Sequence, residues 1–343
     1  VVAFSQAAAP RLAGLALASI AQQLGEVTFL ALCGRKPVGA VGGWASGSGA
    51  AGLLGAGSWI ILKGALHLPT ETSLLWLSPA PLLLSVIYIA LLRDPSPVWV
   101  QRQEEADAAG LDVLAVDPVE GPKALQSPEV IRQLLEQQVT ESEEGKDGLG
   151  TARRWATIRA LALPYMLPLV VVYFFEYLMN QAMALPLGFA VTSKAGQAKH
   201  AAGACSTYRN LQLMYQTGVF LSRSSVHFLP LPVLWPLPVL QGLNAALALV
   251  PMVWYHAGGA GVPPPLQAWL LAFFLWEGLL GGATYVNAFT NISKMFSSHR
   301  QREFGLGVTS LADNLGVVLA AGTALLLEPR LISFLGVDGH FKC

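Results

Sequence analysis

Charged residues are scarce in this chain, and their scarcity excludes several classes of protein. Asp, Glu, Lys and Arg make up 12% of the 343 residues, whereas soluble domains average about 25%. The formal net charge is zero, so nothing suggests binding to nucleic acid. Hydrophobic residues make up 53% of the chain, and the mean hydropathy is +0.50. This composition indicates a membrane protein.

Catalytic and metal-binding motifs are lacking as well. The three cysteines, Cys33, Cys205 and Cys343, are too few and too scattered for a disulfide framework or a zinc site. Neither GxxxxGK(S/T), HExxH nor GxSxG occurs, and the six histidines have no metal-ligand spacing. We therefore expect no enzymatic activity, no cofactor and no bound metal.

Long apolar segments, in contrast, are abundant. A helix that spans a bilayer needs about 20 mostly apolar residues. Eight segments meet this requirement: 11–33, 38–62, 74–92, 160–183, 207–229, 231–254, 266–291 and 304–327. They predict an all-α polytopic membrane protein with a helical bundle like that of the major facilitator transporters. In the second segment, Gly43 and Gly47 have GxxxG spacing, which predicts close packing of that helix against another.

Residues 93–157 differ from the rest of the chain. They hold 13 of the 21 acidic residues and no sustained apolar period, so we expect a mostly disordered linker. On either side lie three spans in 1–92 and five in 158–343. A transporter of two six-helix halves that begins before residue 1 gives this pattern, so we expect its first spans to be missing here. Eleven Lys and Arg residues near span ends, against five on the other side, favour a cytosolic linker.

Four acidic residues lie inside apolar spans, where an ionised carboxylate is costly. They are Glu26, Glu176, Glu277 and Asp313. Such side chains should face the interior of a bundle or a wet cavity, and they commonly mark pathways for ions or substrates. Hydrogen bonding between helices, without any further function, is the alternative interpretation. For the carboxylates the two interpretations stand about even.

Further polar side chains share helical faces with these acids. In the fourth span Tyr173 and Asn180 lie on the face of Glu176, and Gln181 follows; in the seventh, Thr284 and Asn287 lie on the face of Glu277. We expect these two faces to line a polar central cavity. The fifth span carries Tyr215 on a polar face and ends in Arg223. Arg223 either extends to the membrane interface or belongs to a pocket.

Six stretches, in chain order, resemble the battenin family of lysosomal membrane proteins, whose loss causes juvenile neuronal ceroid lipofuscinosis. They are GEVTFL (25–30), GAAGLLGA (49–56), VVVYFFEY (170–177), YQTGVFLSRSS (215–225), EGLLGGATYVNAF (277–289) and LADNLG (311–316). The resemblance implies a fold similar to the major facilitator superfamily and residence in lysosomal and late endosomal membranes. It also implies that Glu176, Arg223 and Asp313 are sensitive positions.

The resemblance further implies a role in clearing glycerophosphodiesters from lysosomes, with export as the expected activity, and links to lysosomal pH, autophagy and trafficking. The expected partners are the lipid bilayer and a small anionic phosphodiester. Arg223 would bind the phosphate, and Glu176 or Glu277 would take up a proton. A membrane scaffold without transport activity, which recruits trafficking adaptors through 93–157, is the alternative.

Three features depart from the battenin pattern. The first spans are missing, so we expect this chain alone not to transport. The chain ends in GHFKC without a prenylation box, and 184–206 contains no glycosylation sequon. The acidic-dileucine sorting signal expected in the linker has only an imperfect candidate. In that candidate, one residue too many separates Glu129 from Leu134 and Leu135. The hydrophobic face of a short helix explains the two leucines equally well.

Overall fold

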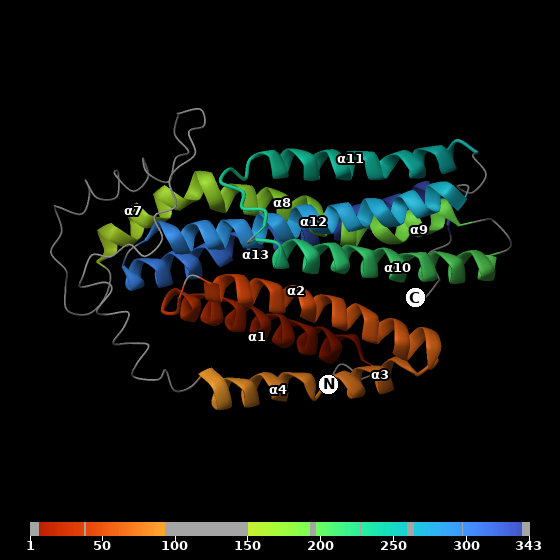
Figure 1. Ribbon diagram of the computed structural model, residues 1–343. Helices are drawn as coiled ribbons and strands as arrows, with labels where there is room; N and C mark the ends of the chain where they lie inside the picture. Colours follow the sequence, from red (N-terminus) through yellow and green to blue (C-terminus); the bar gives the residue numbers. More distant parts are fainter. Residues whose placement is uncertain are drawn as a thin grey trace. The chain divides into compact units, whose positions relative to one another are not determined.

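Helices account for all the regular secondary structure of the computed structural model in its described residues (Figure 1). These residues are 7–37, 39–92, 150–192, 197–226, 228–258, 264–296 and 298–337. The chain divides into two units, Val1–Ala21 with Trp59–Ser127 and Gln22–Ser58 with Pro128–Cys343. Two of the three boundaries between the units fall inside helices α1 (Ala8–Gly34) and α2 (Gly39–Ile60), and the third, after Ser127, lies outside the described residues.

Seven of the described helices are long and apolar enough to cross a membrane. They are Ala9–Gly34, Gly39–Ala65, Thr70–Ala90, Thr151–Val191, Pro236–His256, Gln267–Met295 and His299–Phe334. Helix α10 (Gln197–Ser224) corresponds to the fifth predicted span, 207–229; it has 28 residues, about 42 Å at 1.5 Å per residue. It is more polar than the others because it begins ten residues before the predicted start at 207. The prediction of an all-α polytopic membrane protein is confirmed.

The first unit contains the start of α1 and the segment that follows α2. Its further elements are η1 (Ile61–Ala65), α3 (Thr70–Leu77), α4 (Ala80–Ile87) and η2 (Tyr88–Leu92). The Lys63 ammonium donates to the Leu68 carbonyl at 3.0 Å and to the Thr70 hydroxyl at 3.2 Å, which fixes the turn between η1 and α3. Pro79 separates α3 from α4 because proline has no amide hydrogen to continue the helical ladder.

In the second unit, one continuous helix runs from Thr151 to Val191. It consists of α7 (Thr151–Leu161), η3 (Ala162–Met166), α8 (Leu167–Leu178), η4 (Met179–Met183) and α9 (Ala184–Val191). Pro164 lies in the wider π-helical turn η3, where its missing donor and its ring are accommodated. The helix is longer at both ends than the predicted span 160–183. Residues 151–157, which were expected to belong to the linker, are therefore helical; 93–149 lie outside the described residues.

The remaining helices of this unit are α11 (Pro236–His256), α12 (Pro264–Met295) and α13 (His299–Phe334). Helix α11 exposes an apolar face. Leu243, Leu247, Val250 and Trp254 are exposed at helical spacing, while Met252 and the polar residues Gln241 and Asn244 are buried on the other side. An apolar outer face suits a membrane, where lipid tails cover it.

Glycines bring α10 and α12 into backbone contact, and the two helices run side by side (Figure 1). A Cβ atom at Gly278 would overlap the carbonyl oxygen of Tyr215, and one at Gly218 would overlap that of Leu275. Gly282 lies one turn further on, against Val219. Because 215 pairs with 278 and 219 with 282, the helices are parallel. Small residues permit such close approach within a membrane.

The predicted GxxxG contact of the second span is wrong. Cβ atoms built at Gly43 and Gly47 would meet nothing within 4 Å. Helix α2 instead approaches α10 through Gly49 and Gly52, where a Cβ would meet the Phe220 backbone and the Gln216 side chain. The whole segment is rich in small residues, so its spacing alone did not identify which pair faces a neighbour.

Substituting alanine for Gly278 is expected to destabilise the protein by about 1–3 kcal/mol or more, because the new methyl group overlaps backbone that cannot move aside. The matched control is Gly322→Ala in α13, where the added Cβ meets nothing within 4 Å and helix propensity favours alanine by up to about 1 kcal/mol. Thermal unfolding in detergent micelles measures both. Equal stability of the two variants would contradict the proposed contact.

Candidate functional site

Glu176 is buried at the end of α8, with 2% of its surface exposed. Its Oε1 atom accepts a hydrogen bond of 2.6 Å from the Tyr215 hydroxyl of α10. The carboxylate also lies directly against α12, because a Cβ at Gly281 would overlap it. The Glu176 carboxylate therefore contacts both α10 and α12, the two helices whose backbones meet at Gly218 and Gly278.

One turn later, Asn180 in η4 links the same three helices. Its amide nitrogen donates to Oε1 of Glu277 at 2.9 Å and to the Glu176 carbonyl at 2.8 Å. Its amide oxygen accepts a hydrogen bond of 2.9 Å from Gln212. We call Glu176, Asn180, Gln212, Tyr215 and Glu277 the carboxylate cluster. Its members come from α8, η4, α10 and α12, so the polar faces predicted for the fourth, fifth and seventh spans do meet.

Each carboxyl group of this cluster has one oxygen that the described residues leave without a partner. Within this part of the chain, the buried Oε2 atoms of Glu176 and Glu277 accept no hydrogen bond, and Glu277 is 0% exposed. Burying an ionised carboxylate costs several kcal/mol unless donors or a cation compensate it. Among the described residues no group of three His, Cys, Asp or Glu side chains is placed to hold a metal ion.

Arg223, near the end of α10, lies in a second group of polar side chains. Its guanidinium donates to the hydroxyl oxygens of Ser48 at 2.6 Å and Tyr173 at 3.0 Å. The guanidinium carbon lies 3.9 Å from the ring centroid of Tyr285, a cation–π contact. Tyr285 in turn donates to Oε1 of Glu26 at 2.8 Å. We call Arg223, Ser48, Tyr173, Tyr285 and Glu26 the arginine cluster.

Arg223 has capacity for a further acceptor. Its Nε atom is buried without a hydrogen-bond partner, and among the described residues no carboxylate forms an ion pair with it. The Glu26 carboxylate accepts its hydrogen bond from Tyr285, which lies between it and Arg223. The guanidinium therefore lies among side chains of the bundle, and a ligand pocket at Arg223 stays a prediction. A guanidinium with an unused donor suits a ligand with a phosphate or carboxylate group.

The two clusters are neighbours along α8. Tyr173 and Glu176 are three residues apart, and Tyr173 stacks on Tyr177 with ring centroids 5.9 Å apart. Asp313 of α13 is 3% exposed and interacts electrostatically with both Glu26 and Arg223. Gly316 lets α13 approach the α8 backbone at Val170. All four intramembrane acids thus lie around one short part of α8.

Other residues expected at the site lie elsewhere or bond only locally. Thr284 is fully buried but donates to the Leu280 carbonyl of its own helix. Asn287 accepts from the Leu231 amide at 2.7 Å and so holds the segment before α11. Gln181 is exposed and joins neither cluster. Leu134 and Leu135 lie outside the described residues.

Three members of the two clusters were not predicted as site residues. Tyr285, 0% exposed, connects Arg223 to Glu26 and also accepts a hydrogen bond of 3.1 Å from Trp44. Gln212 and Ser48 complete the contacts of Asn180 and Arg223. Gln212 shares the polar face of Tyr215 in the sequence, which was an available signal. Ser48 gave none, because small residues surround it.

Comparison with known families gives the identity of the chain. The family model described as "CLN3 protein" matches residues 1–334. The chain belongs to this family. In dog, the CLN3-family protein battenin is 37% identical over 331 residues, which are 96% of this chain and 67% of battenin. Protein BTN1 of Saccharomyces cerevisiae is 35% identical, over 93% of this chain and 74% of BTN1. No solved structure matches the chain significantly. The predicted resemblance to battenin is confirmed.

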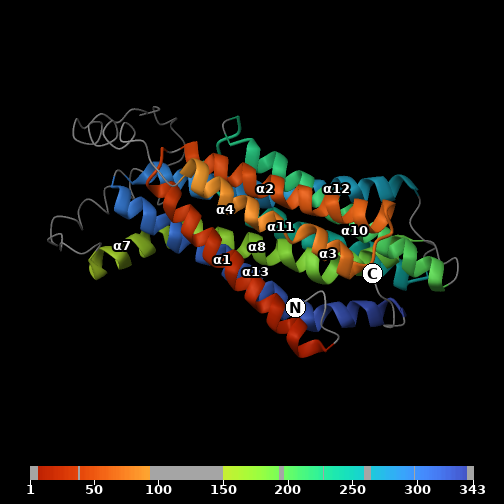
Figure 2. The same ribbon diagram turned by 90° about the horizontal axis from the view of Figure 1, so that it is seen from below.

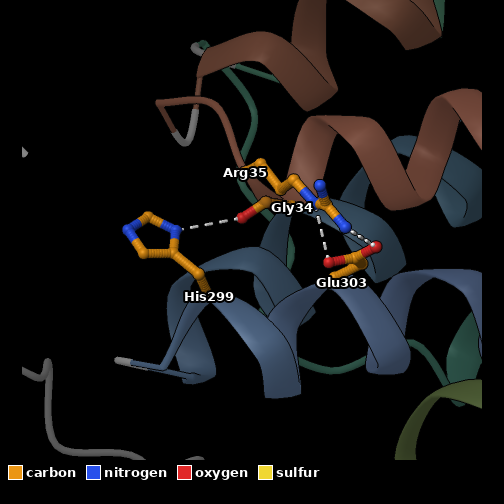
Figure 3. Close-up of polar contacts among 4 residues, drawn as sticks. All are labelled: Gly34, Arg35, His299 and Glu303. Carbon is orange, nitrogen blue, oxygen red and sulfur yellow. Dashed lines mark hydrogen bonds and ion pairs between the residues drawn. The ribbon is translucent and has the colours of Figure 1, made fainter. Parts of the chain in front are cut away.

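This CLN3-family chain has a further polar contact where the end of α1 meets the start of α13 (Figures 2 and 3). Arg35 and Glu303 form a two-pronged ion pair with both hydrogen bonds at 2.8 Å. The hydrogen bond and the charge of Glu303 raise the pKa of Arg35. Beneath it, buried Arg302 donates to the Gly34 carbonyl at 2.7 Å, and His299 lies 3.3 Å from the same oxygen.

The two arginines of this contact should differ in importance. Arg35→Ala is expected to cost less than about 1 kcal/mol, because exposed ion pairs contribute little. Arg302→Ala should cost about 1.5–3 kcal/mol, because it removes a buried charge-assisted hydrogen bond to the Gly34 carbonyl. Denaturation of the purified variants measures both. A larger loss for Arg35→Ala than for Arg302→Ala would contradict this ranking.

Proposed function

We propose that this protein is a lysosomal membrane carrier that exports small anionic phosphodiesters, glycerophosphodiesters in particular. Its resemblance to battenin supports the location and the substrate class. The observation that carries the proposal is Arg223, a partly buried cation with an unused donor and no ion pair among the described residues. A scaffold that only anchors in the membrane has no need for such a group.

The arginine cluster suits the chemistry of a phosphodiester. Such a substrate carries one negative charge on two free oxygens, which a guanidinium binds through two parallel hydrogen bonds. The guanidinium carbon of Arg223 lies over the Tyr285 ring, 3.9 Å from its centroid. The hydroxyls of Ser48 and Tyr173 lie beside the same charge and are able to donate to a phosphate once Arg223 turns toward it. Lysine would supply the charge without this planar geometry.

Transport requires the carboxylate cluster to open. The faces of α8 and α12 were expected to line a cavity, but here they touch, through the bond of Asn180 to Glu277 and the contact of Glu176 with Gly281. Alternating access moves bundles of helices past each other around such a site. The hydrogen bonds of Asn180 and Tyr215 are the contacts that would break and reform in each cycle.

Uptake of labelled glycerophosphoinositol into proteoliposomes tests the proposal. The full-length protein is expected to support flux, and Glu176→Gln and Arg223→Ala introduced into it are expected to abolish flux while the protein remains folded. Absence of flux under every pH gradient would overturn the carrier. The scaffold, which recruits trafficking adaptors through 93–157, would then be the better explanation.

A further inference from the structure

We propose that Glu176 and Glu277 together bind a single proton, which resides on Glu277. The geometry of the carboxylate cluster carries this inference. Glu277 is 0% exposed and Glu176 is 2% exposed. One oxygen of Glu277 accepts a hydrogen bond from Asn180, and one oxygen of Glu176 accepts a hydrogen bond from Tyr215. The second oxygen of each acid accepts none from the residues that the structure describes.

This pattern does not satisfy two ionised carboxylates. A buried carboxylate that remains ionised commonly accepts two or three hydrogen bonds or pairs with a cation. Among the described residues, no Lys, Arg or His forms an ion pair with Glu176 or Glu277. A proton on the unpaired oxygen of Glu277 removes one of the two charges without any further donor. A carboxyl oxygen that carries a proton needs no donor, so the two unpartnered oxygens fit a pair that shares one proton.

The charges around the pair point the same way. The titratable and charged groups that act on α8 in this region are Tyr173 and Tyr177 of α8 itself, Tyr215 and Arg223 of α10, Glu277 and Tyr285 of α12, Asp313 of α13 and Glu26 of α1. With Glu176 these include four carboxyl groups and one guanidinium. Complete ionisation would thus leave a net charge of −3 (four negative, one positive) in the interior of a membrane bundle, where charges are costly.

Arg223 decides which of the two acids carries the proton. Its charge acts on Glu176, whereas the groups acting on Glu277 are Glu176 and Asn180. Glu176 is thus the better placed of the two to stay ionised. Glu277, bonded to a neutral amide and next to a negative charge, is the better placed to hold the proton.

This arrangement links the proton to the substrate, a step that rests on the proposed function. An anion bound at Arg223 takes over the positive charge that otherwise acts on Glu176. The proton affinity of the Glu176–Glu277 pair then rises, so the anion and the proton bind together and move as a neutral unit. A lysosome is acidic inside, so a gradient of one pH unit would support about tenfold accumulation of a singly charged anion on the neutral side.

Infrared spectroscopy of the substrate-free protein in lipid tests the site directly, because a protonated carboxyl group has its own carbonyl band. The unsubstituted protein should show this band, growing as the pH is lowered from 8 to 5. Glu277→Gln should lose the pH-dependent band, and so should the Glu176→Gln, Glu277→Gln double variant. Glu328→Gln, a change at a less buried acid of α13, should keep it.

The outcomes separate this inference from the proposed function. A band that persists unchanged in Glu277→Gln and in the double variant, or that the unsubstituted protein lacks, would overturn the proton site. Thermal unfolding of each variant shows whether it is folded. If a variant is unfolded, the pH titration of the carbonyl band in the unsubstituted protein still tests the proton site. A normal band together with no phosphodiester flux would instead overturn the carrier and leave the proton site in place. Sodium-dependent loss of the band would replace the proton by Na⁺ as the resident ligand and would also overturn the inference.

Discussion

Replacing Arg223 with alanine should reduce phosphodiester flux about 30-fold or more, since removing the charged partner of a buried anion costs about 2–5 kcal/mol. The reason is the position of the guanidinium, held between Ser48, Tyr173 and the Tyr285 ring with its Nε atom unused. Arg223→Lys should recover only part of the flux, because an ammonium keeps the charge but not the planar, two-pronged geometry. Initial rates of labelled glycerophosphoinositol uptake measure both.

Two controls separate loss of binding from loss of folding. Arg330→Ala removes an exposed arginine of α13 and should leave the rate within about twofold of the unsubstituted protein. Unfolding temperatures of the Arg223 variants show whether they are folded. Full flux in a folded Arg223→Ala variant would exclude this residue as the anion-binding group.

The sequence predicted the site better along a helix than between helices. Helical periodicity placed Tyr173, Glu176 and Asn180 on one face, and the structure has all three in the two clusters. Burial cost selected Glu26, Glu277 and Asp313, which now surround the same part of α8. A polar side chain within an apolar span must find a partner inside the bundle. The sequence of the span therefore predicts that such a side chain faces the bundle interior.

The partners themselves were not predictable in this way. Glu26 is bonded to Tyr285, 259 positions away in the chain, and no pattern within either span indicates this pairing. Thr284 lies on the expected face but satisfies its hydroxyl on its own helix, as threonine commonly does. Asn287 bonds to a connecting segment. Periodicity predicts which residues share one face of a helix, whereas helix packing decides which residues of that face contact a neighbouring helix.

Helix packing also explains the error at Gly43 and Gly47. Helix α2 contains many small residues, so several faces are able to approach a neighbour. The face that does so carries Gly49, Gly52 and the Ser48 hydroxyl that bonds to Arg223. The close approach of α2 to α10 therefore contributes to the arginine cluster, because it brings the Ser48 hydroxyl oxygen within 2.6 Å of a guanidinium nitrogen of Arg223.

Replacing Asn180 with leucine should have the largest effect on stability among single substitutions in the carboxylate cluster. The amide makes three hydrogen bonds, to Glu277, to the Glu176 carbonyl and from Gln212. Leucine has a similar size and can form none of them. Glu277 would then be fully buried with no donor, and a buried polar group left without its partner costs about 1–3 kcal/mol, more when it is charged. We expect a total loss of about 3–5 kcal/mol.

The neighbouring residue provides the matched control for this prediction. Gln181 is exposed and bonds to neither cluster, so Gln181→Leu should change the stability by no more than about 0.5 kcal/mol. Unfolding in detergent micelles at pH 5 and pH 8 measures both variants. If Glu277 carries a proton, Asn180→Leu should be less unstable at pH 5, where the acid is neutral, than at pH 8. Equal stability of the two leucine variants would show that Asn180 does not join α8 to α12, and without that link the proposed proton site loses its geometry.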